Sequence, residues 1–246
     1  MFRYKFTIEY DGSAAEVGWQ LQPDKVSIQS ILSEAAFKLS QSHIIFHGAG
    51  RTDKGVHAYG QVAHADFLRE YPLVSLKRGI NFHLGDHKVA IQNVEPVPND
   101  FHARFEAKMK TYRYDICIRD YPNVLSPNNW RMVYKLNIDE MRNAAQFLLG
   151  KHDFTSFRDN NCQALSAERS IDEINFEVKR DIISIYFIAR SFLHHQIRIM
   201  VGTLVDVGLG RKNSDIRNII SSKSRDLAGP TAPANGLFLE KIEYSI

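Results

Sequence analysis

The feature that most constrains the fold is an order of strands and helices that the residue pattern predicts twice along the chain. Residues 3–10 alternate between apolar and polar, which is typical of a strand with one buried face. Apolar residues then recur at helical spacing from Ile28 to Leu39, directly after Ser27, whose hydroxyl suits a helix cap. Two further strands, a helix and a last strand are predicted at residues 44–46, 61–67, 73–82 and 88–97.

The second half repeats this order. Residues 110–118 alternate again, and Asn137 followed three residues later by Glu140 predicts the start of a helix through Leu149 that Gly150 ends. A hairpin, a helix and a final strand follow, at residues 170–178 with 182–190, 197–205 and 237–244.

Both halves therefore read βαββαβ, the order of a ferredoxin-like unit. We predict an α+β fold in which each unit forms an antiparallel sheet with helices on one face, leaving the other face open for a ligand. The two sheets are expected to merge side by side into one broad sheet, with the functional cleft between the halves. The expected division is residues 1–105, which hold the glycine-rich loop described below, and residues 106–246, which complete the cleft.

Composition narrows the class of protein. Hydrophobic residues make up 44% and charged residues 24% of the 246 residues, which excludes disordered and fibrous classes. No apolar run approaches the roughly 20 residues that span a membrane, and the N-terminus has no signal-peptide pattern. The two cysteines, Cys117 and Cys162, form no CxxC pair, which argues against a disulfide framework or a thiolate zinc site. These features favour a cytoplasmic protein, and a net charge of +3 permits a nucleic-acid partner without requiring one.

The densest cluster of chemistry-bearing residues is the segment from Gly48 to Ala58. Its three glycines let the backbone approach a partner closely, and an arginine, a threonine, an aspartate and a lysine lie between them. The segment joins two predicted strands, where rigid scaffolds often hold functional groups. It matches neither a Walker A loop nor GxGxxG. From local chemistry alone, a glycine-rich turn with solvated charges explains it as well as a functional site does.

Within this segment, Gly50–His57 resembles the GRTDxGVH signature of the TruA family of tRNA pseudouridine synthases. Other landmarks of that family occur in family order along nearly the whole chain: Tyr10-Asp11-Gly12, Gly18-Trp19-Gln20, Asp100-Phe101-His102-Ala103-Arg104-Phe105, Lys110-Thr111-Tyr112-Arg113-Tyr114, His152-Asp153-Phe154-Thr155-Ser156-Phe157, Phe192-Leu193-His194-His195-Gln196-Ile197-Arg198 and Ala232-Pro233 with Gly236-Leu237. One departure is the segment Ser13–Val17, which is one residue longer than usual in the family and lacks an aromatic residue. It affects an RNA contact or packing near this turn, and not the chemistry.

The resemblance implies the pseudouridine synthase fold and an isomerase that converts uridine to pseudouridine at positions 38, 39 and 40, in the anticodon stem and loop of tRNA. Such a reaction breaks the N1–C1′ bond, turns the uracil in place and rejoins it through C5. Redox state and bond order are unchanged overall, so no cofactor is expected. The resemblance also implies a cytoplasmic homodimer whose partner is tRNA.

Four site residues follow from the positions that match the family. Asp53 is expected to be the catalytic nucleophile, because a carboxylate is the side chain used to trap an electron-poor anomeric carbon. Arg51 is expected to contact phosphate or to help extrude the base. Tyr112 is expected to stack on the flipped uridine, although its strand position alone favours core packing. Arg198 is expected to bind at the substrate and pair with Asp53, which would hold the carboxylate ionised, whereas a lone helix arginine is more often solvated.

Two further groups of residues have side chains suited to metal or phosphate binding. His57 with His64, and His194 with His195, lack the helical i,i+4 pairing or cysteine partners of a convincing metal site, so no metal is expected. Basic residues suited to tracking phosphates are scattered along the chain, and the sequence does not place them on one face: Lys77, Arg78, Lys108, Lys110, Arg113, Lys179 and Arg180.

Two other classes of function stay open beside the synthase. A non-catalytic RNA-binding module of paired ferredoxin-like sheets would need stacking aromatics but no GRTD loop, and the chain has no RNP1 signature. A glycoside hydrolase would use Asp53 with a second carboxylate as general acid, such as Asp66 or Asp100, and nothing in the spacing indicates that either lies near Asp53.

Overall fold

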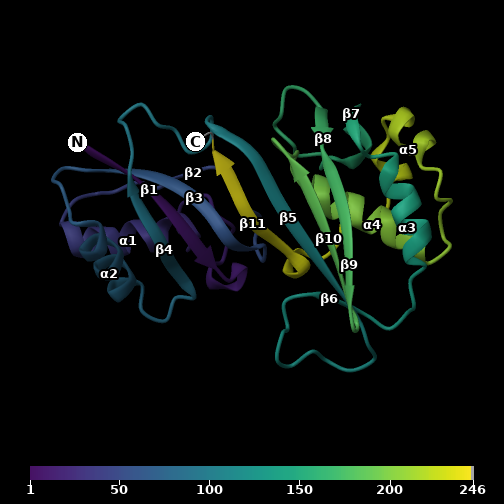
Figure 1. Ribbon diagram of the computed structural model, residues 1–246, viewed down its shortest axis with the longest axis horizontal. Coiled ribbons are helices and arrows are strands. Elements are labelled where there is room, and N and C mark those ends of the chain that lie inside the picture. The colour runs from purple at the N-terminus through teal and green to yellow at the C-terminus, as the bar shows by residue number, and fades with distance from the viewer. Residues whose placement is uncertain (245–246) are drawn as a thin grey trace. The chain divides into compact units, whose positions relative to one another are not determined.

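The alternation of the first strand determines the core of the first sheet in the computed structural model, which describes residues 1–244 (Figure 1). Strand β1 (Phe2–Tyr10) buries Tyr4, Phe6, Ile8 and Tyr10 on one face. It pairs antiparallel with β3 (His57–Phe67) on one side and with β4 (Val89–Pro96) on the other. The short strand β2 (His47–Gly48) pairs with the other edge of β3, so the order is β4-β1-β3-β2.

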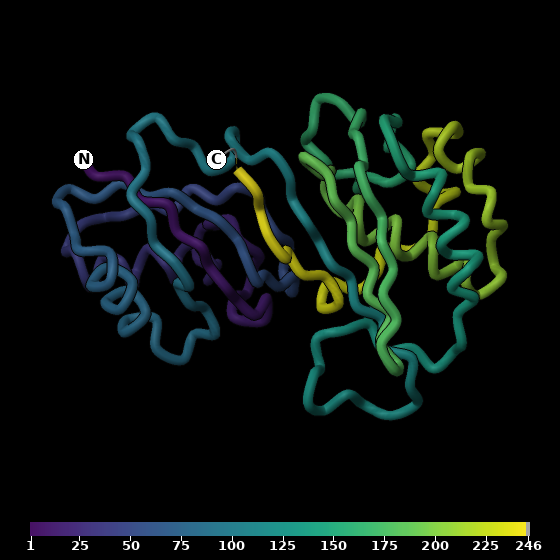
Figure 2. The backbone as a smooth tube through the Cα atoms, viewed as in Figure 1, coloured from purple at the N-terminus to yellow at the C-terminus, as the bar shows by residue number. Residues whose placement is uncertain are grey.

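These strands belong to the first of two units into which the chain divides. The first unit comprises Met1–Lys108 and the segment that begins at Phe238, and the second comprises Met109–Leu237 (Figures 1 and 2). The C-terminal strand β11 (Leu237–Tyr244) runs parallel to β3, with Phe238 opposite His57. In this grouping the segment from Phe238 belongs with the first unit, whereas we expected residues 106–246 to form the second half.

Two helices complete the first unit. Helix α1 (Ile28–Ser40) begins with a reciprocal cap, in which the Ser27 hydroxyl accepts from Ser30 N and the Ser30 hydroxyl accepts from Ser27 N, at 3.0 and 2.8 Å. Helix α2 (Leu73–Leu84) ends at Gly85, whose φ of 52° favours glycine. The two helices pack against each other, and α2 also packs on β4. A single 3₁₀ turn, η1 (Gly12–Ala14), follows β1.

The second unit has its own antiparallel sheet. Strand β5 (Ala107–Ile118) pairs with β10 (Ile182–Ala189), which pairs in turn with β9 (Glu173–Lys179). Strand β6 (Trp130–Met132) lies parallel to the end of β5. A separate two-stranded sheet consists of β7 (Gly150–Asp153) and β8 (Glu168–Ile171).

Helix α4 (Gln196–Gly208) is the centre of the second unit, since nearly all of its residues are buried. It packs against α3 (Ile138–Gln146), which begins where the Asn137 side chain accepts from Glu140 N. The short helix α5 (Arg217–Ser222) and three 3₁₀ turns complete the unit: η2 (Thr155–Phe157), η3 (Arg225–Leu227) and η4 (Ala234–Gly236).

The α+β class is confirmed, and the first unit has the strand and helix order of the predicted βαββαβ arrangement. Several predicted boundaries are wrong. The strand expected at 44–46 begins only at His47, α3 ends at Gln146 instead of Leu149, and the strand expected at 170–178 is two strands that meet at Asp172. Within residues 1–244, no helix has the length and apolar character needed to cross a membrane.

Candidate active site

The glycine-rich segment forms the loop between β2 and β3 in the first unit. Thr52 is buried with 8% of its surface exposed, and Asp53 beside it is half-buried. Arg51 and Lys54, the cations on either side of this pair, are exposed. The loop therefore presents one partly shielded carboxylate between two solvated positive charges.

A buried polar network holds the first part of this loop. The hydroxyls of Tyr10 and Thr52 share a hydrogen bond of 2.8 Å. Gln61, which is fully buried on β3, donates to the carbonyl of Gly50 at 2.8 Å and to the Tyr10 hydroxyl at 3.4 Å. Burial raises the pKa of Tyr10 to about 12, so the phenol keeps its proton at neutral pH. The network ties the backbone just before Asp53 to two strands of the sheet.

The segment after β1 holds the second part of the loop through backbone contacts. Trp19 N donates to the Thr52 carbonyl at 3.0 Å, and Gly55 N donates to the Gly12 carbonyl at 3.3 Å. A Cβ at Gly18 would lie 1.9 Å from the Thr52 carbonyl oxygen, and one at Gly12 would lie 2.4 Å from the Val56 oxygen. The glycines of the first two landmarks are therefore required by close approach to the loop that carries Asp53.

His57 and His64 each use one ring nitrogen to accept a backbone hydrogen bond. The Nδ1 atom of His57 accepts from Gly12 N at 3.0 Å, and that of His64 accepts from Ala103 N at 3.2 Å. His57 also lies 3.2 Å from an Asp11 carboxylate oxygen. Because Gly12 N–H can only donate, Nδ1 of His57 acts as an acceptor, and the same nitrogen has no proton to give to Asp11.

The second unit holds the other two predicted site residues. Tyr112 lies on β5 opposite Phe187 and is 8% exposed. The ring of Phe192 meets it edge-on, with centroids 5.3 Å apart and an interplanar angle of 85°. Packing of this kind agrees with a core role, and the stacking role of Tyr112 stays a prediction.

Arg198 lies in the first turn of α4 and is half-buried. Its Nε donates to the carbonyl of Ala232 at 2.7 Å, and Ala232 N donates to the carbonyl of Arg198 at 3.0 Å. The next residue, Pro233, accepts from the Tyr114 hydroxyl at 2.8 Å. The Ala232-Pro233 landmark thus anchors the Nε end of the Arg198 guanidinium. The pairing of Arg198 with Asp53 stays a prediction.

A contact that the sequence did not reveal lies just before α4. Asp159 Oδ2 is 2.8 Å from Nδ1 of His195, and the ring of His194 lies against that of His195 with centroids 3.9 Å apart and planes tilted by 30°. His195 has a left-handed backbone, with φ of 60°. The 36 residues between Asp159 and His195 explain why no local pattern indicated this contact.

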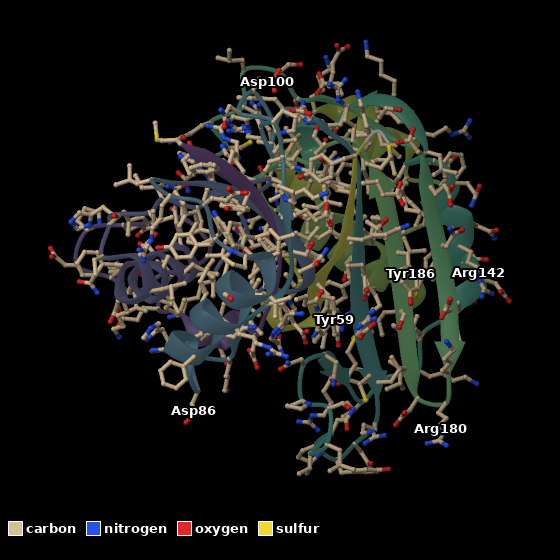
Figure 3. All side chains as sticks on the ribbon, turned by 60° about the vertical axis from the view of Figure 1, so that its left-hand side comes forward. Tyr59, Asp86, Asp100, Arg142, Arg180 and Tyr186 are labelled. Carbon is tan, nitrogen blue, oxygen red and sulfur yellow. The ribbon has the colours of Figure 1, made fainter. Side chains whose placement is uncertain are left out.

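The two carboxylates considered as a general acid for glycoside hydrolysis do not suit that role. Asp66 forms a two-pronged ion pair with Arg3, at 2.8 and 2.7 Å, and this hydrogen bonding lowers the pKa of Asp66. It also lies near the end of β3 opposite to His57, where the Asp53 loop joins the strand. Asp100 is exposed at the periphery (Figure 3). Asp66 is therefore held as a charged carboxylate at the far end of β3 from the Asp53 loop.

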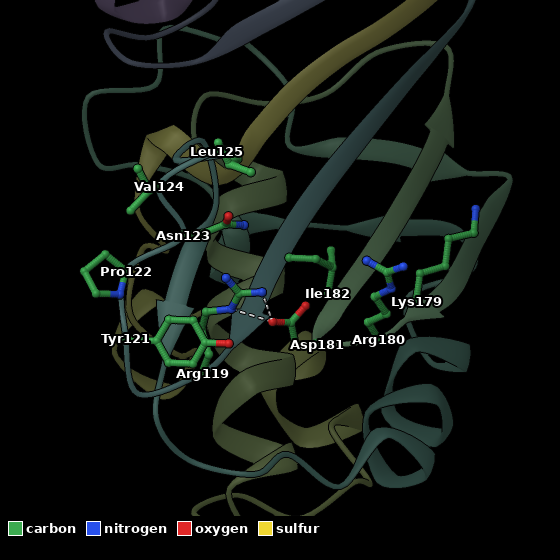
Figure 4. Close-up of a pocket in the computed structure, with 10 residues that line it drawn as sticks. All are labelled: Arg119, Tyr121, Pro122, Asn123, Val124, Leu125, Lys179, Arg180, Asp181 and Ile182. Atoms are coloured by element: carbon green, nitrogen blue, oxygen red, sulfur yellow. Dashed lines mark hydrogen bonds and ion pairs between the residues drawn. The ribbon is translucent and has the colours of Figure 1, made fainter.

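A hollow of about 510 Å³ in the second unit contains none of the four predicted site residues. It lies between the β9–β10 turn and residues 121–125 (Figure 4). Two of the three cations in its lining pair with neighbours, Arg119 with Asp181 and Lys179 with Glu177 at 3.0 Å, and the third is Arg180. Most of the positive charge of the hollow is therefore balanced within the protein.

Comparison with known proteins gives a consistent result over the whole chain. A model of the tRNA pseudouridine synthase family matches residues 7–106 and 144–245. Proteins named tRNA pseudouridine synthase A are similar to the chain in Afipia carboxidovorans (44% identical), Ehrlichia ruminantium (44%) and Rhodopseudomonas palustris (45%). Each comparison covers 246 residues, which is 99% of this chain and 100% of the relative.

Proposed function

Because the chain belongs to the tRNA pseudouridine synthase family, we propose that it isomerises uridine to pseudouridine in tRNA, at positions 38, 39 and 40 of the anticodon stem and loop. The observation that carries the proposal is the loop of Asp53, which stands at the position of the family signature. Its backbone is held by Trp19 N and Gly12 O, and its carboxylate is partly shielded from water. A fixed carboxylate with exposed cations beside it suits chemistry on the sugar of a polyanion.

The proposed reaction needs only groups that the chain and the RNA supply. The bond between N1 and C1′ breaks, the uracil turns, a bond between C5 and C1′ forms, and the proton of C5 is finally lost while N1 gains one. Asp53 acts as the nucleophile that traps the electron-poor centre. Arg51 contacts phosphate, Tyr112 stacks on the extruded base, and Arg198 binds at the substrate and keeps the carboxylate ionised.

The proposal extends to the setting of the enzyme. We propose that it acts in the cytoplasm as a homodimer, without metal or cofactor, and that tRNA is its partner. Light scattering of the purified protein, alone and with tRNA, measures the number of copies in each particle.

The deciding experiment compares wild type with Asp53→Asn on unmodified tRNA transcripts that carry a single uridine at position 38, 39 or 40. The variant keeps the size of the side chain but loses the charge and the nucleophile. We expect it to fold and bind tRNA, and to form no pseudouridine. The matched control is Asp86→Asn, the same substitution at an exposed position of the first unit (Figure 3).

The outcomes separate the three classes of function. Pseudouridine formed by wild type and by Asp86→Asn, but not by Asp53→Asn, supports the synthase. Released uracil would indicate a glycoside hydrolase, and bound but unchanged RNA would indicate a binding module. An Asp53→Asn rate within tenfold of wild type would refute the role of this residue.

A further inference from the structure

The turn Asp159–Cys162 is hydrogen-bonded to the two histidines that precede α4. Asp159 N donates to the carbonyl of His194 at 3.1 Å, and Asp159 Oδ2 lies 2.8 Å from Nδ1 of His195. The other carboxylate oxygen, Oδ1, accepts from Asn161 N at 2.8 Å, and Cys162 N donates to the Asp159 carbonyl at 3.0 Å. One carboxylate therefore closes its own turn with Oδ1, which also lies 3.8 Å from Nδ1 of His194, and holds the His195 imidazole with Oδ2.

The imidazole that Asp159 holds belongs to the residue where α4 begins. His195 has a left-handed backbone, and its carbonyl accepts the first helical hydrogen bond, from Ile199 N at 2.9 Å. A carboxylate only accepts hydrogen bonds, so the proton between the two groups lies on Nδ1 of His195. The contact thus selects a ring orientation, a tautomer and a backbone conformation at one residue.

Arg198 follows His195 by three residues and is held on its other side by Ala232. Further along α4, the Thr203 hydroxyl accepts from Gly229 N at 2.8 Å, and a Cβ at Gly202 would lie 1.8 Å from the Pro230 oxygen. The body of α4 is therefore fixed by residues 229–232, and its first turn is fixed by Asp159. The position of the Arg198 guanidinium depends on both anchors.

We propose that Asp159 is a positioning residue for the reaction of this enzyme: through His195 it fixes the first turn of α4, and with it the guanidinium of Arg198. This inference rests on the proposed function, because Arg198 has a role to be positioned for only if the chain acts on tRNA. Displacement of a group that binds the reacting centre by about 1 Å can slow a reaction by two orders of magnitude.

The substitution Asp159→Asn tests the contact with the ring separately from the turn. The amide oxygen can still accept from Asn161 N, so the turn is kept, whereas the amide NH₂ donates where a carboxylate oxygen accepted. We expect the single-turnover rate of pseudouridine formation to fall about tenfold, while the Kd for tRNA changes less than threefold. The matched control is Asp215→Asn, because Asp215 also accepts from the backbone N–H two residues on, and it lies on an exposed turn.

A double-mutant cycle tests whether Asp159 acts through His195. His195→Asn removes the ring but tolerates the left-handed backbone. We expect Asp159→Asn to slow the His195→Asn enzyme less than threefold further, because the contact is already absent. Rate losses that multiply, or an Asp159→Asn rate within twofold of wild type, would overturn the inference.

A measurement on the wild type keeps the inference testable should the variants fold poorly. The ¹⁵N chemical shifts of the His195 ring report which nitrogen is protonated, and we expect the proton on Nδ1 in the wild type and its loss from Nδ1 in Asp159→Asn. An unprotonated Nδ1 in the wild type would overturn the inference. A wild-type enzyme that forms no pseudouridine would defeat the proposed function as well, whereas an active wild type with a silent Asp159→Asn would defeat this inference alone.

Discussion

Gly18→Ala should disable the enzyme by displacing the loop that carries Asp53. The added Cβ would lie 1.9 Å from the Thr52 carbonyl oxygen and 2.7 Å from the Asp53 carbonyl carbon, whereas ordinary contacts of a Cβ begin at 3.4 Å. Both neighbours are backbone atoms, so the clash is relieved only when the segment of Gly18 or the Asp53 loop moves by roughly 1.5 Å. A displacement of this size at a reacting group slows a reaction by about a hundredfold.

The same displacement has a cost in stability. Overpacking in a well-packed region costs about 1–3 kcal/mol. The hydrogen bond from Trp19 N to the Thr52 carbonyl, 3.0 Å long, would also be strained, which adds about 1 kcal/mol. We therefore expect Gly18→Ala to lower the free energy of unfolding by about 2–4 kcal/mol. Urea denaturation measures this change.

Gly85→Ala is a matched control that separates lost stability from a displaced loop. Gly85 has φ of 52° and ψ of −126°, and a Cβ there would meet nothing within 4 Å. The strain of this backbone conformation costs an alanine about 1–3 kcal/mol, but Gly85 lies at the end of α2, and its added Cβ would touch no part of the loop. Single-turnover rates are compared at a temperature where circular dichroism shows both variants folded. The reasoning is refuted if Gly18→Ala keeps a rate within threefold of wild type, or if Gly85→Ala loses as much.

Two further predictions concern buried polar groups of the first unit. Thr52→Val should lower the free energy of unfolding by about 1–2 kcal/mol, because the buried Tyr10 hydroxyl loses its 2.8 Å partner, and Thr7→Val on β1 is the matched control in urea denaturation. Equal effects at both positions would contradict it. Burial lowers the pKa of His64 from 6.5 to about 4, so an unfolded chain takes up a proton in this range that the folded chain does not. The free energy of unfolding should therefore decrease as pH falls from about 6.5 to 4, by at most about 3 kcal/mol from this residue. The decrease should be smaller in His64→Asn. Parallel plots of unfolding free energy against pH for wild type and His64→Asn would contradict the assignment.

The parts of the fold that the sequence predicted well are those set by local pattern. The alternation of β1, the Ser27 cap of α1 and the bounds of β11 needed only neighbouring residues. Residues 44–46 show the limit of this reading. Ile44 and Phe46 are buried like strand residues, but pairing with β3 begins only with His47 opposite His64. Burial alternation alone does not reveal where a ladder of hydrogen bonds starts.

The end of α3 was missed for a related reason. Phe147, Leu148 and Leu149 continue the apolar pattern, but their N–H groups bond to carbonyls three residues back, at 3.0 to 3.3 Å, so the last turn tightens. Gly150 follows with φ of 83°. The strand expected at 170–178 is interrupted at Asp172, whose N–H donates to Ile188 on β10 while β8 pairs with β7. Which partner a strand chooses depends on tertiary contacts that its own period does not encode.

The candidate site likewise contains residues that a local motif predicts and residues that only the fold brings together. Asp53 was predicted from a motif that is contiguous in sequence, and its catalytic role stays a prediction. The residues that hold its loop were not found, because Tyr10 lies 42 residues from Thr52, and Gln61 lies 51 residues from Tyr10. Asp159 lies 36 residues from His195. Each is an ordinary polar residue in its own segment, and only the fold gives it a partner.

The order of residues in the Asp53 loop offsets the repulsion between its carboxylate and the phosphates of the proposed RNA substrate. A carboxylate that acts on RNA meets phosphates of like charge, and two unit charges about 8 Å apart repel by roughly 0.5 kcal/mol in water and about 2 kcal/mol at an effective dielectric constant of 20. Arg51 and Lys54 flank the Asp53 segment and are exposed, so they attract phosphate over the same distance. The anion needs a fixed position, and bonds to the carbonyls of Thr52 and Asp53 supply it. Arg51 and Lys54 need only to be near a phosphate, and long solvated side chains meet that need without a fixed position. Rigid and mobile charges therefore occupy adjacent positions of one loop.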